Sequence, residues 1–217
     1  MSLPCTGNKL PDIASVDCTD TATQIDQCCK LMQIEEDVLL YDQPNQAYYW
    51  VLLNADEIQL IVCNLEKYAD KAEKIGNWMG RCCDYLVMGW YDGDRYIVII
   101  ELRHILTKED QAIEKLDQVE KSIDQVISKL LPHIANSPLF AEACPQPENY
   151  KIAGIVIAPA GIRSIARNKR TRIIRNDSYT AIITMMPPER IKACKITWSE
   201  LLSQITVASG RKRFQRH

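Results

Sequence analysis

Two short segments each place a carboxylate next to an apolar strand pattern, and these carboxylates are the first candidates for a catalytic or metal-binding role. Residues 83–87 read Cys-Asp-Tyr-Leu-Val and residues 96–103 read Tyr-Ile-Val-Ile-Ile-Glu-Leu-Arg, two apolar strand patterns that each bear a carboxylate. Glu101 ends a run of residues that are usually buried, where a charge is costly unless it is paired or binds a metal. Glu101 and Arg103 are two positions apart and share one face of a strand. With Asp84 on the neighbouring strand, the pattern predicts a divalent metal held over a phosphate.

The elements around these segments must position them. The spacing of apolar residues predicts a helix over 55–76, a hairpin with strands 82–88 and 95–103, and a long helix over 108–131. Asp92-Gly93 supplies the positive φ of the hairpin turn. Thr107 is the expected cap of the long helix, and Pro132 its expected end.

The rest of the chain gives weaker signals before the long helix and stronger ones after it. Residues 28–42 fit a short helix or a strand, and 47–53 a buried strand or the entry to a helix; both alternatives stay open. Later segments predict a buried strand, two further strands and a closing helix to about residue 206 with a Thr197–Glu200 capping box; the strands are 152–158, 171–175 and 179–186. A helix between two strands of one sheet implies a right-handed crossover. The fold class expected is α/β, a mixed central sheet flanked by helices.

Composition bounds the organisation and the location. With 217 residues, 47% of them apolar and 25% charged, the chain suits one globular domain, expected over 28–209 between a polar arm (1–27) and a basic tail (210–217). No apolar run approaches the roughly 20 residues of a membrane span, and the N-terminus does not resemble a signal peptide. The nine cysteines include no Cys-x-x-Cys, so we expect reduced thiols in a cytoplasmic protein and no zinc site.

Charge is distributed unevenly along the chain. Residues 1–150 hold 12 Lys and Arg against 25 Asp and Glu, a net charge of −13, whereas residues 151–217 hold 14 against 3, a net charge of +11. A basic third suggests a polyanion such as nucleic acid as the partner. The alternative is that the acidic and basic parts neutralise each other, within one chain or between copies in a homo-oligomer.

The order of these elements and their charged residues resembles the PD-(D/E)XK nuclease superfamily, which has the restriction-endonuclease-like fold. The resemblance spans about residues 54–160: a helix with a glutamate (Glu66 or Glu73), Asp84 in Cys-Asp-Tyr-Leu-Val, and Glu101-Leu102-Arg103 in place of Glu-x-Lys. It implies that Asp84, Glu101 and Arg103 are the catalytic residues. It also implies Mg²⁺ or Mn²⁺ as the cofactor, held by Asp84, Glu101 and Glu66 or Glu73.

Arginine in the lysine position is a departure from the family pattern. Arginine stays protonated and cannot act as a base, but it can clamp a phosphate oxygen. Each site residue also has a structural alternative: Asp84 could cap a turn, Glu101 and Arg103 could form a simple ion pair, and the two helix glutamates could pair with surface lysines. Gln118 on the long helix is interpreted as a surface residue, with support of the site as the alternative.

A second pattern lies just after the buried strand. Six basic residues fall within thirteen positions, with no aromatic residue before Tyr179; they are Arg163, Arg167, Lys169, Arg170, Arg172 and Arg175. Such a segment suits phosphate contacts, which give affinity without sequence choice. The alternative is a solvated loop, or a surface that pairs with acidic residues of the same chain.

The leading hypothesis is a metal-dependent hydrolase that cleaves phosphodiester bonds in DNA or RNA. The alternative is a catalytically inactive member of the same fold that binds nucleic acid or a protein partner. A third hypothesis is an interaction module that self-associates through its charge polarity.

Overall fold

The fold is described from a computed structural model that covers residues 5–18, 25–43, 47–73, 78, 80–103, 106–134, 137, 140, 150–158, 162, 165–175, 177–186 and 188–213. The strands are β1 (Thr6–Gly7), β2 (Cys29–Met32), β3 (Asp37–Asp42), β4 (Tyr48–Asn54), β5 (Leu60–Asn64), β6 (Tyr85–Tyr91), β7 (Asp94–Leu102), β8 (Tyr150–Ile157), β9 (Thr171–Arg175), β10 (Thr180–Met186) and β11 (Lys195–Thr197). The helices are α1 (Leu65–Glu73), α2 (Glu109–Gln125), α3 (Leu131–Ile134) and α5 (Trp198–Arg213), with a π-helical turn (Val126–Leu130) and 3₁₀ turns at Ile25–Cys28, Arg167–Lys169 and Pro188–Arg190.

A seven-stranded mixed sheet forms the centre, in the order β2-β5-β6-β7-β8-β10-β9. The strands β7, β8 and β10 are parallel to one another, and all other neighbours are antiparallel. A smaller sheet combines β1, β3, β4 and β11, segments that lie far apart in the sequence. The chain is therefore mixed α/β, as the sequence predicts.

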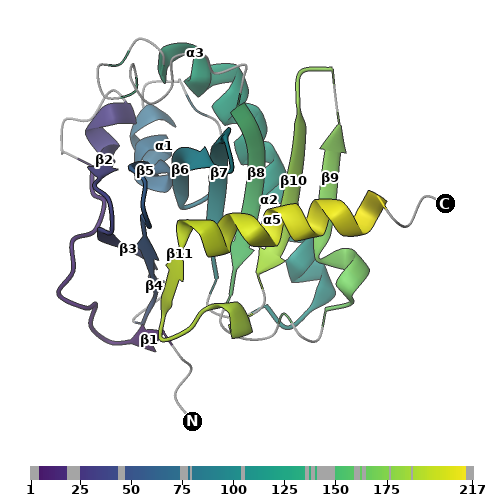
Figure 1. The fold of residues 1–217 in the computed structure, drawn as a ribbon, viewed down its shortest axis with the longest axis horizontal. Helices are drawn as coiled ribbons and strands as arrows, with labels where there is room; N and C mark the ends of the chain where they lie inside the picture. The colour runs from purple at the N-terminus through teal and green to yellow at the C-terminus, as the bar shows by residue number, and fades with distance from the viewer. Residues whose placement is uncertain are drawn as a thin grey trace.

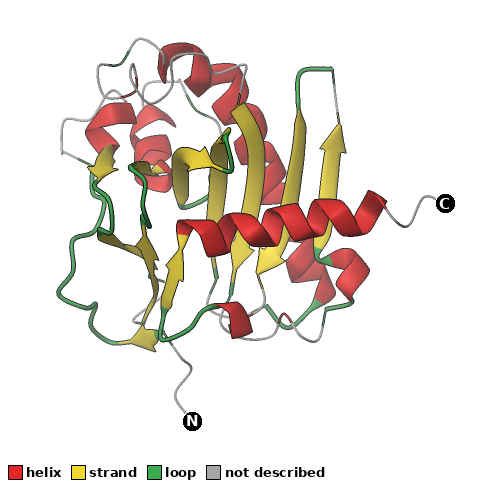
Figure 2. Ribbon diagram, in the orientation of Figure 1, coloured by secondary structure: helices red, strands yellow, loops and turns green. Residues whose placement is uncertain are grey.

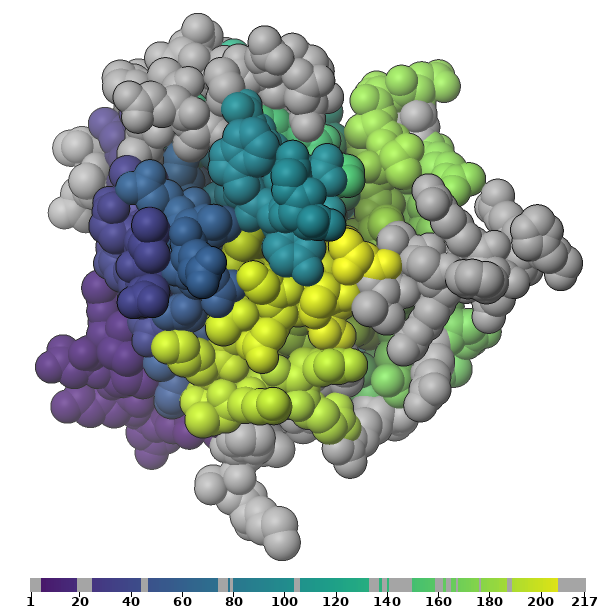
Figure 3. Space-filling view, viewed as in Figure 1, coloured from purple at the N-terminus to yellow at the C-terminus, as the bar shows by residue number. Residues whose placement is uncertain are grey.

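The large sheet has a different covering on each face (Figures 1 and 2). Helices α1 and α2 cover one face, where Ile97 and Ile99 of β7 belong to the core. Helix α5 and the smaller sheet cover the other face, where Val98 and Ile100 point. Figure 3 shows α5 in yellow beneath the teal tip of the β6–β7 hairpin, and Trp198 Nε1 donates a hydrogen bond to the Trp90 carbonyl there at 2.7 Å. Burial on both faces explains the unbroken apolar runs of the central strands.

The hairpin and the crossover that follows it are the parts that position the charged residues. Asp92 and Gly93 have φ of 50° and 77°, so the predicted positive φ is confirmed. The strands run further into the predicted connection, with β6 ending at Tyr91 and β7 beginning at Asp94, and they leave a two-residue turn. From β7 the chain passes through α2 to β8, which pairs in parallel with β7. A Cβ on Gly154 of β8 would stand 2.2 Å from Val119 Cγ1, so glycine allows α2 to lie close to the sheet.

Both predicted ends of the long helix need correction. The helix begins at Glu109, with Lys108 rather than Thr107 in the N-cap position, because the Gln111 side chain accepts a hydrogen bond from the Lys108 amide at 3.4 Å. Pro132 does not end the helical path. The π-helical turn shifts the hydrogen-bond register before the proline, with the Leu131 amide donating to the Val126 carbonyl, and α3 continues through Pro132.

The predicted helix over 55–76 is wrong in its first half. Residues 60–64 form strand β5, which is buried along its whole length between β2 and β6, and only residues 65–73 form α1 among the positions described. The two early segments with open alternatives are strands: residues 28–42 contain β2 and β3, and residues 47–53 contain most of β4. At the other end, the capping box of α5 is confirmed by the Thr197 and Glu200 hydrogen bonds, both 3.1 Å. The helix continues to Arg213, four residues into the predicted tail.

Six cysteines expected as reduced thiols are paired in disulfides: Cys5–Cys194, Cys18–Cys28 and Cys29–Cys63. Cys82 and Cys83 are free and buried, as small apolar side chains often are. The pairing was missed because no spacing in the sequence identifies the partners, which lie 189, 10 and 34 residues apart. Disulfides are typical of oxidising compartments, so they weigh against the cytoplasmic location, which stays a prediction. No helix in the described part of the chain is long and apolar enough to cross a membrane.

Candidate active site at the ends of β6 and β7

Strand pairing places the two predicted carboxylates opposite each other. Tyr85 pairs with Ile100 in the β6–β7 ladder, so Asp84 and Glu101 occupy the next position outward. Residues directly opposite share one face of an antiparallel pair. That face is the one covered by α1 and α2, because Leu86 and Ile99, each two residues further along its strand, belong to that core. The Asp84 side chain points toward β7, where its Oδ2 accepts a hydrogen bond from the Leu102 amide at 2.5 Å.

Glu101 is completely buried and is surrounded by donors from two elements. Its Oε1 lies 2.5 Å from Arg103 Nη2 and 3.3 Å from Lys115 Nζ, and its Oε2 accepts a hydrogen bond from Gln118 Nε2 at 3.2 Å. Lys115 Nζ also donates to Gln118 Oε1 at 2.7 Å. Both contacts of Oε1 are ion pairs, so a metal ion at this oxygen would have to displace Arg103 or Lys115.

Asp84 also fixes the start of α1 through its backbone. The Asp84 carbonyl accepts hydrogen bonds from the amides of Leu65 at 2.9 Å and Glu66 at 3.2 Å. These amides belong to the first turn of α1, where no intrahelical partner exists. The helix is therefore docked by its N-terminus onto the residue that carries the site carboxylate.

The carboxylates of the site are crowded and poorly hydrated. Burial, followed by the nearby charges of Glu101 and Glu66, holds the pKa of Asp84 well above its usual value, against the opposing effect of the Leu102 amide. Burial also raises the pKa of Glu101, although Arg103 and Lys115 act in the other direction. Like-charged groups that share a dry site cannot all ionise at little cost, so this cluster favours either protons or a cation.

Arg103 connects the cluster to the smaller sheet. Its Nη1 lies 3.4 Å from Asp42 Oδ2 at the end of β3, and its amide donates to the Ile157 carbonyl at 2.8 Å. Burial by itself would lower the pKa of Arg103, but the carboxylates of Glu101, Asp84 and Asp42 outweigh it and raise this pKa. The guanidinium therefore stays charged and is held in one orientation.

The structure separates the two glutamates proposed on α1. Glu66 is in the first turn, where partial burial and the charges of Asp42, Asp70 and Glu101 raise the pKa of its carboxyl. Glu73 ends the helix, seven residues and about 10 Å further along the axis; both glutamate side chains reach solvent, so position and not exposure separates them. Only Glu66 therefore lies near Asp84 and Glu101.

The basic segment lies apart from this cluster, against the acidic surface of α2. Arg172 Nη1 lies 2.6 Å from both Asp117 Oδ1 and Glu120 Oε2, and Lys169 pairs with Glu109. Arg170 Nε donates to the Ile165 carbonyl at 2.8 Å, and Arg175 is exposed at the end of β9. Arg163 and the side chain of Arg167 lie outside the described residues. Lys169 and Arg172 therefore pair with acidic residues of the same chain, which is one of the alternatives given for this segment.

Two residues of the cluster differ from the sequence-based expectation: Lys115 was not among the predicted site residues, and Gln118 was expected at the surface. Gln118 is buried against Glu101 and donates to the Cys82 carbonyl at 2.8 Å, so the expected surface position is wrong. A signal existed: Lys115, Gln118 and Ser122 recur at spacings of three and four, which puts three polar residues on one stripe of a helix whose neighbouring stripe is apolar. The Ser122 hydroxyl accepts a hydrogen bond from the Cys83 amide at 3.0 Å and completes this buried polar stripe.

The donor set fits a divalent cation in part. Within the described ranges, no three His, Cys, Asp or Glu side chains already converge closely enough to hold a metal ion. Two buried carboxylates on one sheet face, each with a raised pKa, nevertheless suit a hard cation that takes a few carboxylates together with water.

Comparisons with known proteins do not identify this site. No family model, no curated protein and no solved structure matches the chain. The resemblance to the nuclease superfamily therefore stays a prediction, and the argument for function rests on the geometry of the site.

Proposed function

We propose that this chain is a metal-dependent nuclease of the restriction-endonuclease-like type, which hydrolyses phosphodiester bonds in nucleic acid. The observation that carries the proposal is the opposition of Asp84 and Glu101 on one face of the sheet, with Arg103 and Lys115 directly beside Glu101. A pair of buried carboxylates flanked by fixed cations suits a reaction in which negative charge builds up on a phosphate.

The roles follow from the positions of the side chains. Asp84 and Glu101 would hold Mg²⁺ or Mn²⁺, with Glu66 as the nearest further carboxylate. When bound, the metal supplies an activated water and stabilises charge on the phosphate. Arg103 is kept charged and can hold a phosphate group by hydrogen bonds from its guanidinium.

Lys115 supports the proposal where the sequence departs from the family pattern. The strand position of the expected lysine holds Arg103, but Lys115 reaches the same carboxylate from α2, with its ammonium 3.3 Å from Glu101 Oε1. Gln118 holds that ammonium in place. We therefore assign to Lys115 the task of orienting or deprotonating the attacking water; an arginine could orient the water, but it stays protonated and cannot act as the base.

One observation favours the inactive alternative. Arg103 Nη2 lies 2.5 Å from Glu101 Oε1 and pairs with an oxygen that a metal would need. If this ion pair persists in the presence of metal, the chain binds nucleic acid or a protein without cleaving anything.

Cleavage assays on the full chain separate the two functions. We expect Mg²⁺ or Mn²⁺ to support cleavage of at least one of single-stranded DNA, duplex DNA, single-stranded RNA or duplex RNA, and chelation to stop it. Asp84→Asn and Glu101→Gln should abolish cleavage, and Lys115→Met should lower it by about 10²-fold, the usual scale for a lost proton-transfer group. Glu73→Gln is the matched control and should leave the rate unchanged. Absence of cleavage on all four substrates, with no metal-dependent shift in thermal stability, would overturn the proposal.

A further inference from the structure

The N-terminal strap, residues 5–18, is tied to the body of the protein by a disulfide at each end. Cys5 is bonded to Cys194 and Cys18 to Cys28. Between these ends β1 pairs with β4, and Ser15 forms a bridge to Leu39. The strap is therefore held by two covalent bonds, by short stretches of backbone pairing and by the buried side chain of Val16.

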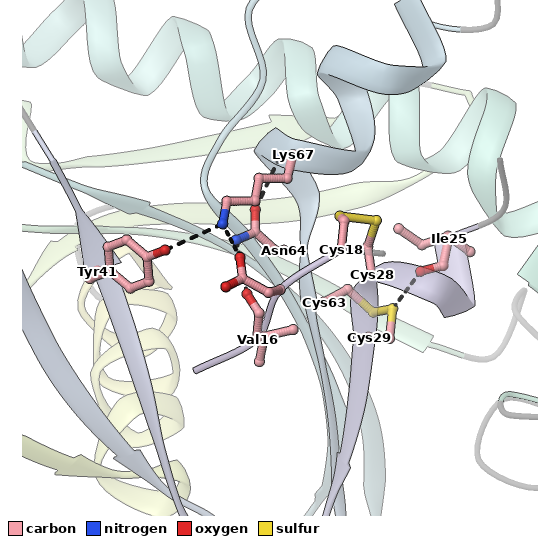
Figure 4. Close-up of a disulfide and its surroundings, with 10 residues drawn as sticks. Val16, Cys18, Ile25, Cys28, Cys29, Tyr41, Cys63, Asn64 and Lys67 are labelled. Carbon is pink, nitrogen blue, oxygen red and sulfur yellow. Dashed lines mark hydrogen bonds and ion pairs between the residues drawn. A yellow bond between two sulfur atoms is a disulfide. The ribbon is translucent and has the colours of Figure 1, made fainter. Parts of the chain in front are cut away.

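The disulfide at the end of the strap is next to a second one. Cys28 and Cys29 are neighbours in the chain, and Cys29 is bonded to Cys63, its direct partner in the β2–β5 register (Figure 4). In each of these bonds one cysteine is partly exposed, Cys18 or Cys29, and the other is buried, Cys28 or Cys63. The partly exposed cysteine of each bond is therefore the one that an external thiolate would approach first.

The strap also touches the cap of α1. Asn64 is the N-cap residue, since its Oδ1 accepts a hydrogen bond from the Lys67 amide at 3.0 Å. The same side chain donates through Nδ2 to the Val16 carbonyl of the strap at 3.1 Å, and Lys67 pairs with Asp17 (Figure 4). Cys18 directly follows these residues, so its disulfide holds the strap against the helix start.

We propose that Cys18, Cys28, Cys29 and Cys63 form a redox site, which dithiol reductants open and whose state controls the N-terminus of α1. For each disulfide, the dithiol gives up two electrons and two protons: its own sulfurs become a disulfide, the protein S–S bond breaks, and two protein thiols form. Opening Cys18–Cys28 releases the end of the strap, and the hydrogen bond from Asn64 to Val16 loses its anchor.

A contact at Cys29 supports the reduced state. Its Sγ lies 2.9 Å from the Ile25 carbonyl oxygen. A disulfide sulfur has no proton to donate to that oxygen, whereas a Cys29 thiol would donate one from the same position. Reduction therefore adds a hydrogen bond at Cys29 while it frees Cys18.

The link to the candidate active site follows from the position of α1. The Glu66 amide and the Lys67 amide lie in the same helical turn, and the Glu66 amide donates to the Asp84 carbonyl. Loosening the cap thus loosens the contact that fixes Asp84. The redox site does not require the chain to be a nuclease; only an effect on cleavage rests on the proposed function.

The test is amide hydrogen exchange on the full chain equilibrated with reduced or oxidised dithiothreitol, with cysteine states read by alkylation and peptide mass spectrometry. We expect both disulfides in the oxidised sample and thiols in the reduced one. Exchange of the Lys67 amide should become about fivefold faster on reduction, the scale of a lost N-cap. Asn64→Ala should show the fast rate in both states.

The double change Cys5→Ala with Cys194→Ala is the matched control, because it removes a disulfide of the same strap at its far end. We expect Lys67 exchange in this variant to be slow when oxidised and fast when reduced, as in the parent chain. The proposal is overturned if these four cysteines alkylate without reductant, or if Lys67 exchanges equally in both states. A redox response in a protein that cleaves nothing would refute the proposed function and leave the redox site standing.

Discussion

The Glu101 cluster and the contacts between α2 and the basic segment combine the same residue types in different surroundings. In the cluster, Glu101 is fully buried between Arg103 and Lys115. In the second group, Arg172 of β9 pairs with two carboxylates of α2, Asp117 and Glu120, whose side chains are 48% and 35% exposed. Water screens the second group, and exposed pairs contribute little to stability. In the first group the charges must compensate each other, so the removal of one partner should be costly.

The two groups show that burial, and not charge alone, distinguishes the candidate functional residues from ordinary surface pairs. A surface pair such as Arg172 with Glu120 forms wherever opposite charges meet, and it satisfies the charge asymmetry of the sequence without any ligand. A buried charged cluster lowers stability and persists where the charges serve catalysis or binding. Perturbed pKa values concentrate at functional sites for this reason. The acidic residues worth testing are therefore the few in the cluster.

The largest effect should come from Lys115→Met. The change leaves the buried carboxylate of Glu101 with one compensating cation fewer, so we expect the free energy of unfolding to fall by about 3 kcal/mol, the lower end of the range for a broken buried pair. Denaturation in urea at neutral pH measures it. The matched control is Lys169→Met, where the loss should stay below about 1 kcal/mol because the pair of Lys169 with Glu109 is exposed to water. Equal losses in both variants would contradict the distinction between the two regions.

Asp84→Asn should act in the opposite direction. The pKa of Asp84 is raised in the folded protein, so the fold binds a proton more tightly than the unfolded chain does. The stability it contributes is present below the ordinary carboxyl pKa of about 4 and is lost as the pH rises through the higher folded value. The variant should therefore be more stable than the parent near neutral pH, by about 1 kcal/mol, the scale of a typical substitution.

Unfolding of both proteins followed from pH 4 to pH 8 is the measurement for Asp84. The parent should lose stability across this range faster than the variant does. Glu101 and Glu66, whose pKa values are also raised, should leave part of the slope in the variant. A variant that is less stable than the parent, with the slope unchanged, would mean that Asp84 is not repelled by its neighbours.

The hairpin and its carboxylates could be predicted because their signals are local. Asp92-Gly93 fixes the turn, the turn fixes the register, and the register places Asp84 opposite Glu101. The strands β8 and β10 were predicted for a similar reason, since each contains a separate run of apolar residues. A short-range sequence pattern was sufficient to predict an element wherever residues close in the sequence are also close in the fold.

Other features depend on contacts that no local pattern encodes. Leu60–Asn64 was predicted as helix because a fully buried strand and a buried helix share the same continuous apolar run. The smaller sheet pairs β4 with β11, segments more than 100 residues apart, and the disulfide partners Cys5 and Cys194 meet in the same way. Lys115 escaped notice because its role depends on how closely α2 approaches β7.

The smallest effect should come from Arg172→Ala, and it decides between the two interpretations of the basic segment. Loss of contacts with Asp117 and Glu120 should cost less than about 1 kcal/mol and should shrink further in high salt, because exposed pairs are screened. If Arg172 serves only this local pairing, the slope of log affinity against log salt for any nucleic acid that the chain binds should be the same in variant and parent. If it contacts phosphate instead, the slope should fall by about one. The same measurement on Arg175→Ala, an exposed arginine at the end of the same strand, is the control, since it changes charge equally without breaking the contacts to α2. A reduced slope for Arg172→Ala alone would place the nucleic-acid surface on the segment that the structure shows paired with α2.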